Sequence, residues 1–106
     1  MNERRQAPRV KVDLLARWEG AMERQEANVT NLSTNGCFVL SGGKVEPKEL
    51  VRLEIFLPNQ DPVYLWAEVV DVAPEIGFAV RFTMSDEDDQ QRLAAYLNEV
   101  LKHQPQ

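Results

Sequence analysis

The sequence predicts an all-β fold, a six-stranded antiparallel β-barrel followed by one C-terminal amphipathic α-helix. Residues 10–83 mostly alternate between apolar and polar side chains, as half-buried strands do, and turn residues interrupt the alternation at short intervals. Near residue 85 the apolar period changes to that of a helix. No helical segment separates the strands, so we expect an antiparallel sheet that is closed or nearly closed, which removes exposed edges.

The expected strands follow one another at short spacing. They occupy residues 10–18, a weaker polar run ending at 28–30, and residues 37–40, 51–57, 63–69 and 78–82. Gly, Pro, Asn and Asp gather between them, most clearly at 58–62 and 74–77, where they favour turns.

One helix is expected over residues 86–102. Ser85 stands at the N-cap position with Asp88 three residues later, and the acids at 86–89 suit the positive end of a helix dipole. An apolar stripe recurs at helical spacing, formed by Leu93, Tyr96, Leu97, Val100 and Leu101. We expect this stripe to pack on the barrel, because the acidic polar face of the helix would be repelled by anionic lipid.

Length and composition exclude several classes of protein. The 106 residues fit a single domain over 1–106, with a flexible basic arm at 1–9, the barrel at 10–83 and the helix at 86–102. No apolar run reaches the roughly 18–20 residues of a membrane span, and residues 1–10 lack the apolar region of a secretory signal, so we expect a cytoplasmic protein without membrane insertion. One Cys and one His support neither an internal disulfide nor a zinc site, and we expect no metal and no cofactor.

The charge is unevenly distributed along the chain. The formal net charge is −5, but residues 1–11 carry +3 and the remaining 95 residues carry −8. A basic arm on an acidic body suits a small anion better than a nucleic acid polymer, whose binding requires the neutralisation of many phosphates. A solvated terminal charge cluster is the alternative explanation.

Arg5 and Arg9 form an Arg-x-x-x-Arg motif just before the first expected strand. Each guanidinium offers a planar fork of donors for phosphate oxygens or a purine edge, and a flat cationic face that stacks on a base. Pro8 disfavours helical geometry at the residue before it, so the arm should stay extended. The motif is therefore a candidate anion-binding element.

Asn31, Ser33 and Gly36 form an Asn-x-Ser-x-x-Gly motif between two expected strands. In extended chain the first two side chains point the same way, and the glycine permits a tight turn with positive φ that brings backbone N–H groups close to a ligand. An ordinary polar turn is the structural alternative.

No catalytic constellation accompanies these motifs. Cys37 lies in an apolar run and is interpreted as a small buried hydrophobe, and His103 lies beyond the apolar stripe near the helix end. Gly42 and Gly43 lack the sequence context of a nucleotide-binding loop. We therefore expect a protein that is not an enzyme.

The two motifs together resemble those of the PilZ domain family. They occur in the family's order on a six-strand plan, residues 65–72 and 76–82 are similar to its fifth and sixth strands, and residues 85–97 resemble its terminal helix. The resemblance implies a six-stranded antiparallel β-barrel that binds the bacterial second messenger cyclic di-GMP on its outer surface and signals through a protein partner.

The resemblance also implies a role for each motif residue. Arg5 and Arg9 would hold the phosphates and guanines, Asn31 and Ser33 would contact guanine and neighbouring polar atoms, and Gly36 would shape the turn. Asp is commoner in the family at the position of Asn31, so that contact is expected to be weaker.

Three further residues are candidates for ligand contact. Arg4, directly before the first motif, is expected to help bind two cyclic di-GMP molecules per chain, because the resembled family uses this position to set the stoichiometry. Trp66 and Arg81 face away from the expected core and would supply a stacking surface and a cation. The alternative function is a ligand-independent protein-interaction module of the same fold, and a third is an oligonucleotide-binding barrel, which the acidic body disfavours.

Overall fold

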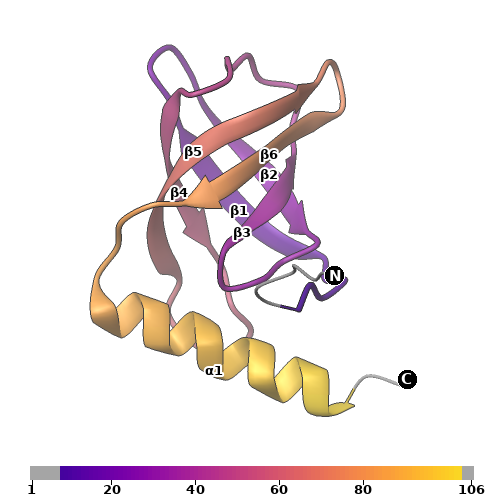
Figure 1. Ribbon diagram of the computed structural model, residues 1–106, viewed down its shortest axis with the longest axis vertical. Coiled ribbons are helices and arrows are strands. Elements are labelled where there is room, and N and C mark those ends of the chain that lie inside the picture. Colours follow the sequence, from indigo (N-terminus) through magenta and orange to yellow (C-terminus); the bar gives the residue numbers. More distant parts are fainter. Residues whose placement is uncertain (1–7, 104–106) are drawn as a thin grey trace, which may run out of the picture.

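The computed structural model describes residues 8–103 and contains six strands followed by one helix (Figure 1). The strands are β1 (Leu14–Glu19), β2 (Arg24–Thr30), β3 (Gly36–Leu40), β4 (Leu50–Ile55), β5 (Val63–Ala73) and β6 (Gly77–Phe82), and the helix is α1 (Glu87–His103). The predicted class, an all-β barrel with one terminal helix, is confirmed.

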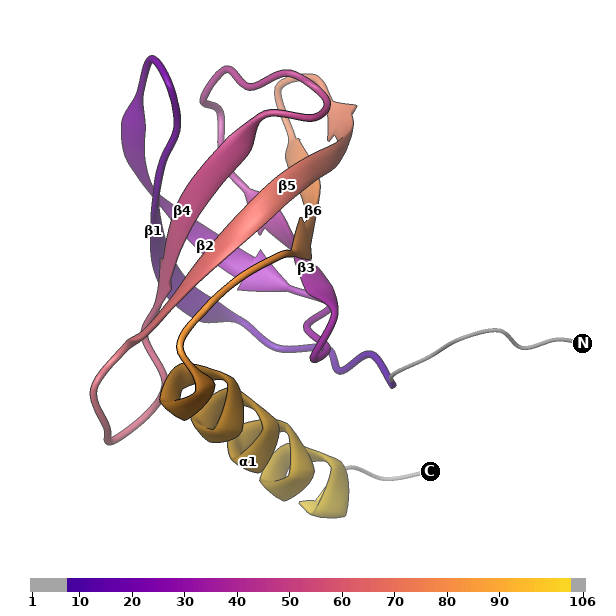
Figure 2. The same cartoon turned by 60° about the vertical axis from the view of Figure 1, so that its left-hand side comes forward.

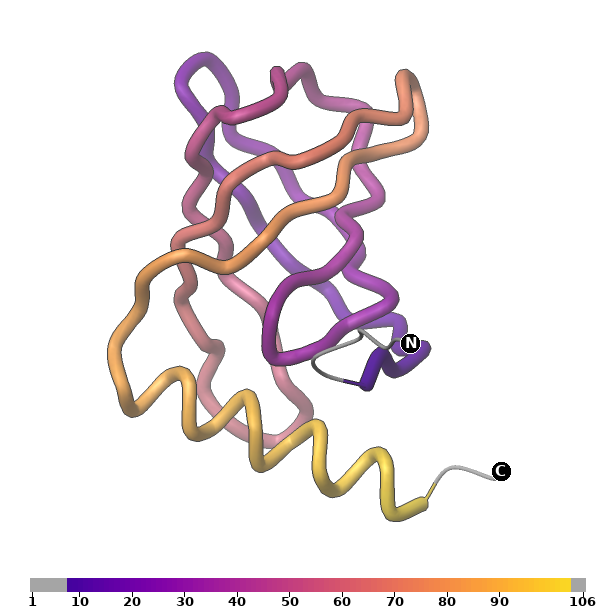
Figure 3. The backbone as a smooth tube through the Cα atoms, in the orientation of Figure 1, coloured from indigo at the N-terminus to yellow at the C-terminus, as the bar shows by residue number. Residues whose placement is uncertain are grey.

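The strands close into a barrel in the order β1-β2-β3-β6-β5-β4. Every neighbouring pair is antiparallel, and the pairing of β1 with β4 completes the closure. The path of the chain around the barrel can be followed in Figure 3, and the barrel is seen from a second side in Figure 2. Closure leaves no strand of the sheet with a free edge.

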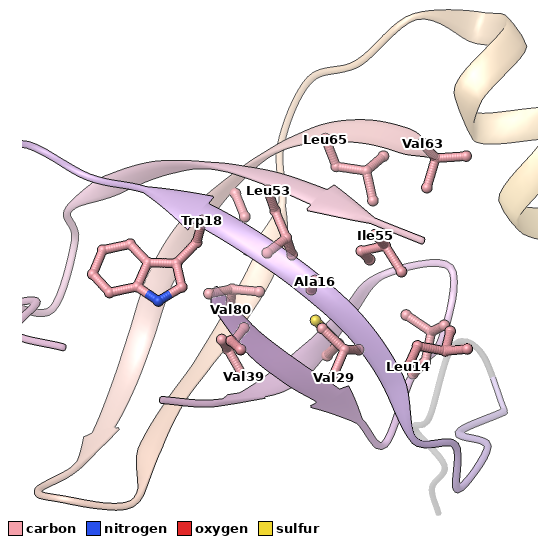
Figure 4. Packing of buried hydrophobic residues seen from close by; sticks show 14 of the residues in the cluster. Leu14, Ala16, Trp18, Val29, Val39, Leu53, Ile55, Val63, Leu65 and Val80 are labelled. Carbon is pink, nitrogen blue, oxygen red and sulfur yellow. The ribbon is translucent and has the colours of Figure 1, made fainter. Parts of the chain in front are cut away.

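The barrel interior is filled by alternate residues of each strand, as the two-residue period predicts. In β1 the inward positions are Leu14, Ala16 and Trp18, and all three are buried (Figure 4). The Trp18 ring meets Phe78 edge to face, with 5.2 Å between ring centroids, and its indole N–H donates to the Ser41 Oγ at 2.9 Å. The largest core side chain thus has its one polar atom satisfied.

The helix α1 lies across one end of the barrel (Figures 1 and 2). Leu93 and Leu97 are buried in the contact, which confirms that the apolar stripe packs on the barrel. Burial also raises the pKa of the Tyr96 hydroxyl. No helix among residues 8–103 is both long enough and apolar enough to span a membrane.

A guanidinium fixes the helix to the connection between β4 and β5. Arg92 donates to the carbonyl oxygens of Asp61 at 2.7 Å and Pro62 at 2.8 Å, and to the carboxylate of Asp89 at 3.0 Å. The sequence predicts that all four acids at 86–89 serve the helix dipole. Asp89 is buried and paired with Arg92, so its role goes beyond the dipole. We call Arg92 and Asp89 the helix clamp.

The predicted start of the helix was one residue early. The backbone N–H of Gln90 donates to the carbonyl oxygen of Asp86 at 3.0 Å, which makes Asp86 the N-cap residue and Glu87 the first helical residue. Ser85, predicted to be the N-cap, instead accepts hydrogen bonds from the Gln90 side chain at its hydroxyl and carbonyl oxygens.

Candidate functional site

An isolated β-bridge joins the two sequence motifs. Val10 and Leu32 exchange backbone hydrogen bonds of 2.8 and 2.9 Å, and both side chains are fully buried. Val10 directly follows Arg9, and Leu32 lies between Asn31 and Ser33. The bridge therefore fixes the last residue of the arginine motif beside the first residues of the polar motif, at the end of the barrel near α1 (Figure 1).

The bridge also corrects the predicted first strand. The sequence predicts one strand from residue 10 to 18, whereas β1 begins at Leu14 and Val10 pairs separately with Leu32. The single apolar residue in the polar segment 31–36 is the sequence signal that identifies Leu32 as an anchor.

Asn31 and Ser33 do not point the same way, contrary to the prediction. Asn31 has φ of 50°, so the chain is not extended there, and its side chain is exposed while Ser33 is only 5% exposed. The Ser33 hydroxyl oxygen accepts the backbone N–H groups of Asn35 at 3.0 Å and Gly36 at 3.3 Å. Ser33 thus holds the turn from inside, and Asn31 presents its amide to solvent.

Gly36 is required for a different reason than predicted. No described glycine has positive φ, but a Cβ at Gly36 would lie 2.1 Å from the carbonyl oxygen of Val80 on β6. Only a residue without a side chain allows β3 and β6 to approach this closely. The backbone of Asn35 extends the contact, because its carbonyl oxygen accepts the N–H of Phe82 at 2.8 Å.

Replacing Gly36 with alanine is expected to lower the free energy of unfolding by about 2 kcal/mol or more, because backbone must move to admit the methyl group. Urea denaturation monitored by tryptophan fluorescence measures the effect. Gly42→Ala is the matched control, since a Cβ there meets no atom within 4 Å. Equal stability of the two variants would contradict the proposed contact.

Arg81 and Trp66 lie on the outer face of the barrel, as predicted. Arg81 pairs in register with Gly36 on one side and Glu68 on the other, and its guanidinium forms an ion pair with the Glu68 carboxylate. Trp66 is 47% exposed and lines an open pocket of about 360 Å³ with Met84. Arg81 is therefore beside the polar motif but already paired, whereas Trp66 presents a free aromatic surface.

A shallow pocket separates the polar motif from the helix. It has a volume of about 440 Å³ and is lined by Thr34 of the motif, Phe82 at the end of β6, and Gln90, Leu93 and others from α1. Two exposed cations, Arg9 and Lys11, stand directly before and after the buried Val10 in the sequence. The end of the barrel thus combines basic groups, an exposed amide and hollow surface, which suits a polar anion.

The described residues offer this site neither a reactive thiol nor a metal-binding cluster. Cys37 is buried, and burial strongly raises the pKa of its thiol, which keeps it in the unreactive protonated form. Residues 8–103 contain no cluster of three or more His, Cys, Asp or Glu side chains that could hold a metal ion. Arg4 and Arg5, predicted to bind the ligand, lie outside the described residues.

The family model of the PilZ domain matches residues 3–99 of the chain. The chain belongs to the PilZ domain family. The match spans both sequence motifs and all six strands, so it confirms the family that the sequence resembles. A search of curated proteins found no match for this PilZ chain.

Solved structures share the fold of this PilZ domain. The Bacillus subtilis inhibitor of motility MotI/DgrA aligns with a TM-score of 0.83 at 23% identity, covering 98% of this chain and 55% of its own. The complex of MrkH from K. pneumonia with c-di-GMP aligns with a TM-score of 0.77 at 16% identity, and the alignment covers 95% of this chain and 53% of MrkH. The PilZ domain of CeSA from a cellulose-synthesizing bacterium aligns with a TM-score of 0.65 at 18% identity, and the alignment covers 90% of this chain and 98% of the CeSA domain. This chain spans about half the length of MotI/DgrA and MrkH.

Proposed function

We propose that this PilZ chain is a non-enzymatic cytoplasmic effector that binds cyclic di-GMP where Arg9 meets the polar motif, and that signals through a protein partner. The observation that carries the proposal is the Val10–Leu32 bridge, because it holds two motifs from separate parts of the sequence side by side. The similarity to MrkH, whose structure contains c-di-GMP, supports the choice of ligand.

Each motif residue has a distinct role in this proposal. Arg5 and Arg9 bind the phosphates and guanines through paired N–H donors and flat cationic faces. Asn31 contacts guanine with its exposed amide, while Ser33 acts indirectly by holding the turn that presents Asn31. Gly36 keeps the turn against β6.

Two residues of the outer face complete the proposed site. Trp66 offers a stacking surface for a base. Arg81 reaches the ligand only if its guanidinium breaks its ion pair with Glu68 or contacts the ligand and Glu68 together. Its contribution is therefore smaller than that of the motif arginines.

Titration calorimetry with cyclic di-GMP tests the function. We expect a dissociation constant of about 1 μM or tighter, equivalent to about −8 kcal/mol, and poor competition by GTP or single-stranded DNA. The absence of binding at about 100 μM protein would reject the proposal and favour the alternative, a ligand-independent interaction module.

Ordering of the arm is part of the proposed mechanism. We expect the amide protons of residues 3–9 to exchange more slowly in the presence of cyclic di-GMP, because an arm with no apolar periodicity gains fixed contacts with the ligand. Val10 is not part of this expectation, since its N–H already donates to Leu32. Affinity should fall as salt shortens the screening length below about 8 Å. Equal exchange with and without ligand would contradict the coupling.

We expect two cyclic di-GMP molecules to bind per chain, with Arg4→Leu shifting the number towards one. Two ligands carry four negative charges, and a third guanidinium beside Arg5 and Arg9 offsets their repulsion and offers another stacking face. Titration to saturation, at protein concentrations well above the dissociation constant, gives the number. An endpoint of one ligand for the unmodified chain would contradict the role of Arg4.

A further inference from the structure

The end of the barrel away from α1 carries a second, larger concavity. It has a volume of about 940 Å³, and three connections line it: the turn between β1 and β2, the segment 41–49, and the turn between β5 and β6. These connections lie together at the top of Figure 1, opposite the helix and the Val10–Leu32 bridge. We call this surface the distal concavity.

Exposed apolar side chains occur at the same end of the barrel as the distal concavity. Nine large apolar side chains are exposed among the described residues, and four of them belong to strand ends or turns at this end of the barrel: Met22, Leu40, Leu50 and Ile76. Met22, which lines the concavity, is 87% exposed, and Ile76, which lies between the lining residues Glu75 and Gly77, is 60% exposed. Exposed apolar side chains beside a concave surface are typical of a binding surface.

Two turns of the same construction line the concavity. In the first turn, the N–H of Glu49 donates to the carbonyl oxygen of Glu46 at 3.0 Å. In the second turn, the N–H of Ile76 donates to the carbonyl oxygen of Ala73 at 3.0 Å. Each turn has proline in its second position, at residues 47 and 74. These are the features of turns in which the third position has positive φ and usually holds glycine or asparagine.

Charged residues occupy both of those third positions. Lys48 has φ of 76° and Glu75 has φ of 69°, whereas the other two described non-glycine residues with positive φ are asparagines, which tolerate this conformation. The backbone at Lys48 is also tied to β5, because its N–H donates to the carbonyl oxygen of Val69 at 2.7 Å. Strained residues of this kind concentrate at functional sites, and both of these line the distal concavity.

The charges of the lining define what the concavity can bind. Four carboxylates and two lysines line it. The carboxylate of Glu49 is engaged by the backbone N–H groups of Ala21 and Glu46, while the side chains of Glu46 and Glu75 are exposed. An acidic lining on a body with a charge of −8 over residues 12–106 attracts a cationic partner and disfavours both anionic lipid and a second copy of the chain.

We propose that the distal concavity binds an apolar, positively charged segment of a partner protein. Met22 and Ile76 contact its apolar side chains, and Glu46 and Glu75 pair with its cations. The positive φ of Lys48 and Glu75 fixes the positions of these two residues. Lys48 repels the cations of the segment and Glu75 attracts them, and together they orient it. This surface lies at the opposite end from the proposed ligand site and does not depend on ligand binding.

Two synthetic peptides test the chemistry of the partner. One is an amphipathic helix of about 14 residues made of leucine and lysine, and its counterpart has glutamate in place of lysine. In NMR titrations of the whole chain, we expect the lysine peptide to shift the amide signals of Met22, Lys44, Glu75 and Ile76 to saturation, and the glutamate peptide to leave them unchanged.

Variants separate the apolar contribution from the charged one. Met22→Ser with Ile76→Ser should weaken binding of the lysine peptide by about tenfold or more, whereas Leu15→Ser, which removes an equally apolar and 65% exposed side chain at the other end of β1, should not. Glu75→Asn should weaken binding roughly threefold while the melting temperature stays the same or rises by about 2–6 °C, because asparagine fits the left-handed position.

Several results would overturn the proposal. These are equal binding of the two peptides, signal shifts centred on α1 or Trp66, or no shift at about 1 mM peptide. Loss of melting temperature in Glu75→Asn would show that the residue serves the fold alone. Self-association that disappears in the Met22→Ser, Ile76→Ser variant would assign the surface to a second copy of the chain.

Discussion

Replacing Arg5 and Arg9 together with alanine is expected to weaken cyclic di-GMP binding by at least about 100-fold. Each charge-assisted hydrogen bond contributes about 1.5–3 kcal/mol, so loss of a single arginine corresponds to roughly 10- to 150-fold. The two guanidiniums act on one ligand, so their effects need not be additive. Calorimetry on the double variant, alongside each single variant, measures both the loss and the coupling.

The matched control is Arg17→Ala with Arg24→Ala. It removes the same two charges from the chain, and both residues lie exposed on β1 and β2. If affinity depended only on the overall charge, the control would lose as much affinity as the motif variant. A loss in the motif variant no larger than in the control would therefore exclude Arg5 and Arg9 as specific ligand contacts.

Replacing Arg92 with methionine is expected to lower the free energy of unfolding by about 2–4 kcal/mol. The substitution removes the donors for the carbonyl oxygens of Asp61 and Pro62 and leaves the buried Asp89 carboxylate without its partner. For a domain of this size, the melting temperature should fall by roughly 10–25 °C. Thermal and urea denaturation give the two values independently.

A second substitution identifies the cause of that loss. Asp89→Asn in the Arg92→Met background should recover part of the stability, since no buried charge then remains. Lys102→Met is the surface control: its ion pair with Glu99 is exposed and 3.9 Å long, and its loss should change stability by less than about 0.5 kcal/mol. A similarly small effect of Arg92→Met would show that the helix clamp does not hold α1.

Local periodicity was sufficient to predict the fold. The alternation in β1, β4 and β5 and the apolar stripe around Leu93 and Leu97 correctly predicted the buried faces, the docking of the helix and the strands, apart from the start of β1. These patterns are visible in sequence because burial of one face sets a fixed spacing along the chain. The closed barrel followed from the number of strands and the absence of helices between them.

The interactions of the site were harder to predict because they join distant residues. Nothing local indicates that Val10 pairs with Leu32, or that a Cβ at Gly36 would collide with Val80. The predicted orientation of Ser33 was wrong because a hydroxyl can face outward or hold its own turn with the same spacing, and here it accepts the N–H groups of the turn. The motifs therefore indicated two segments that the fold brings together, but not the conformation of each side chain.

The helix clamp also combines a contact that the sequence indicates with contacts between distant residues that it does not. Asp89 and Arg92 are three residues apart, a spacing that favours an ion pair on a helix and could have been noticed. The acceptors on residues 61 and 62, about thirty positions earlier, have no such signal. Burial of Asp89 depends on that long-range contact, and so it could not be read from the acidic run.

The polar motif is held at both ends before any ligand arrives, by the Val10–Leu32 hydrogen bonds on one side and by the hydrogen bond from Phe82 to Asn35 on the other. The proposed ligand would therefore meet a preformed surface, and its association rate should be set by diffusion and electrostatic attraction. In the proposed mechanism, contacts made by the arginines would form afterwards and would govern how long the complex persists. In stopped-flow measurements, substitutions at Arg5 or Arg9 should shorten the residence time much more than they slow capture.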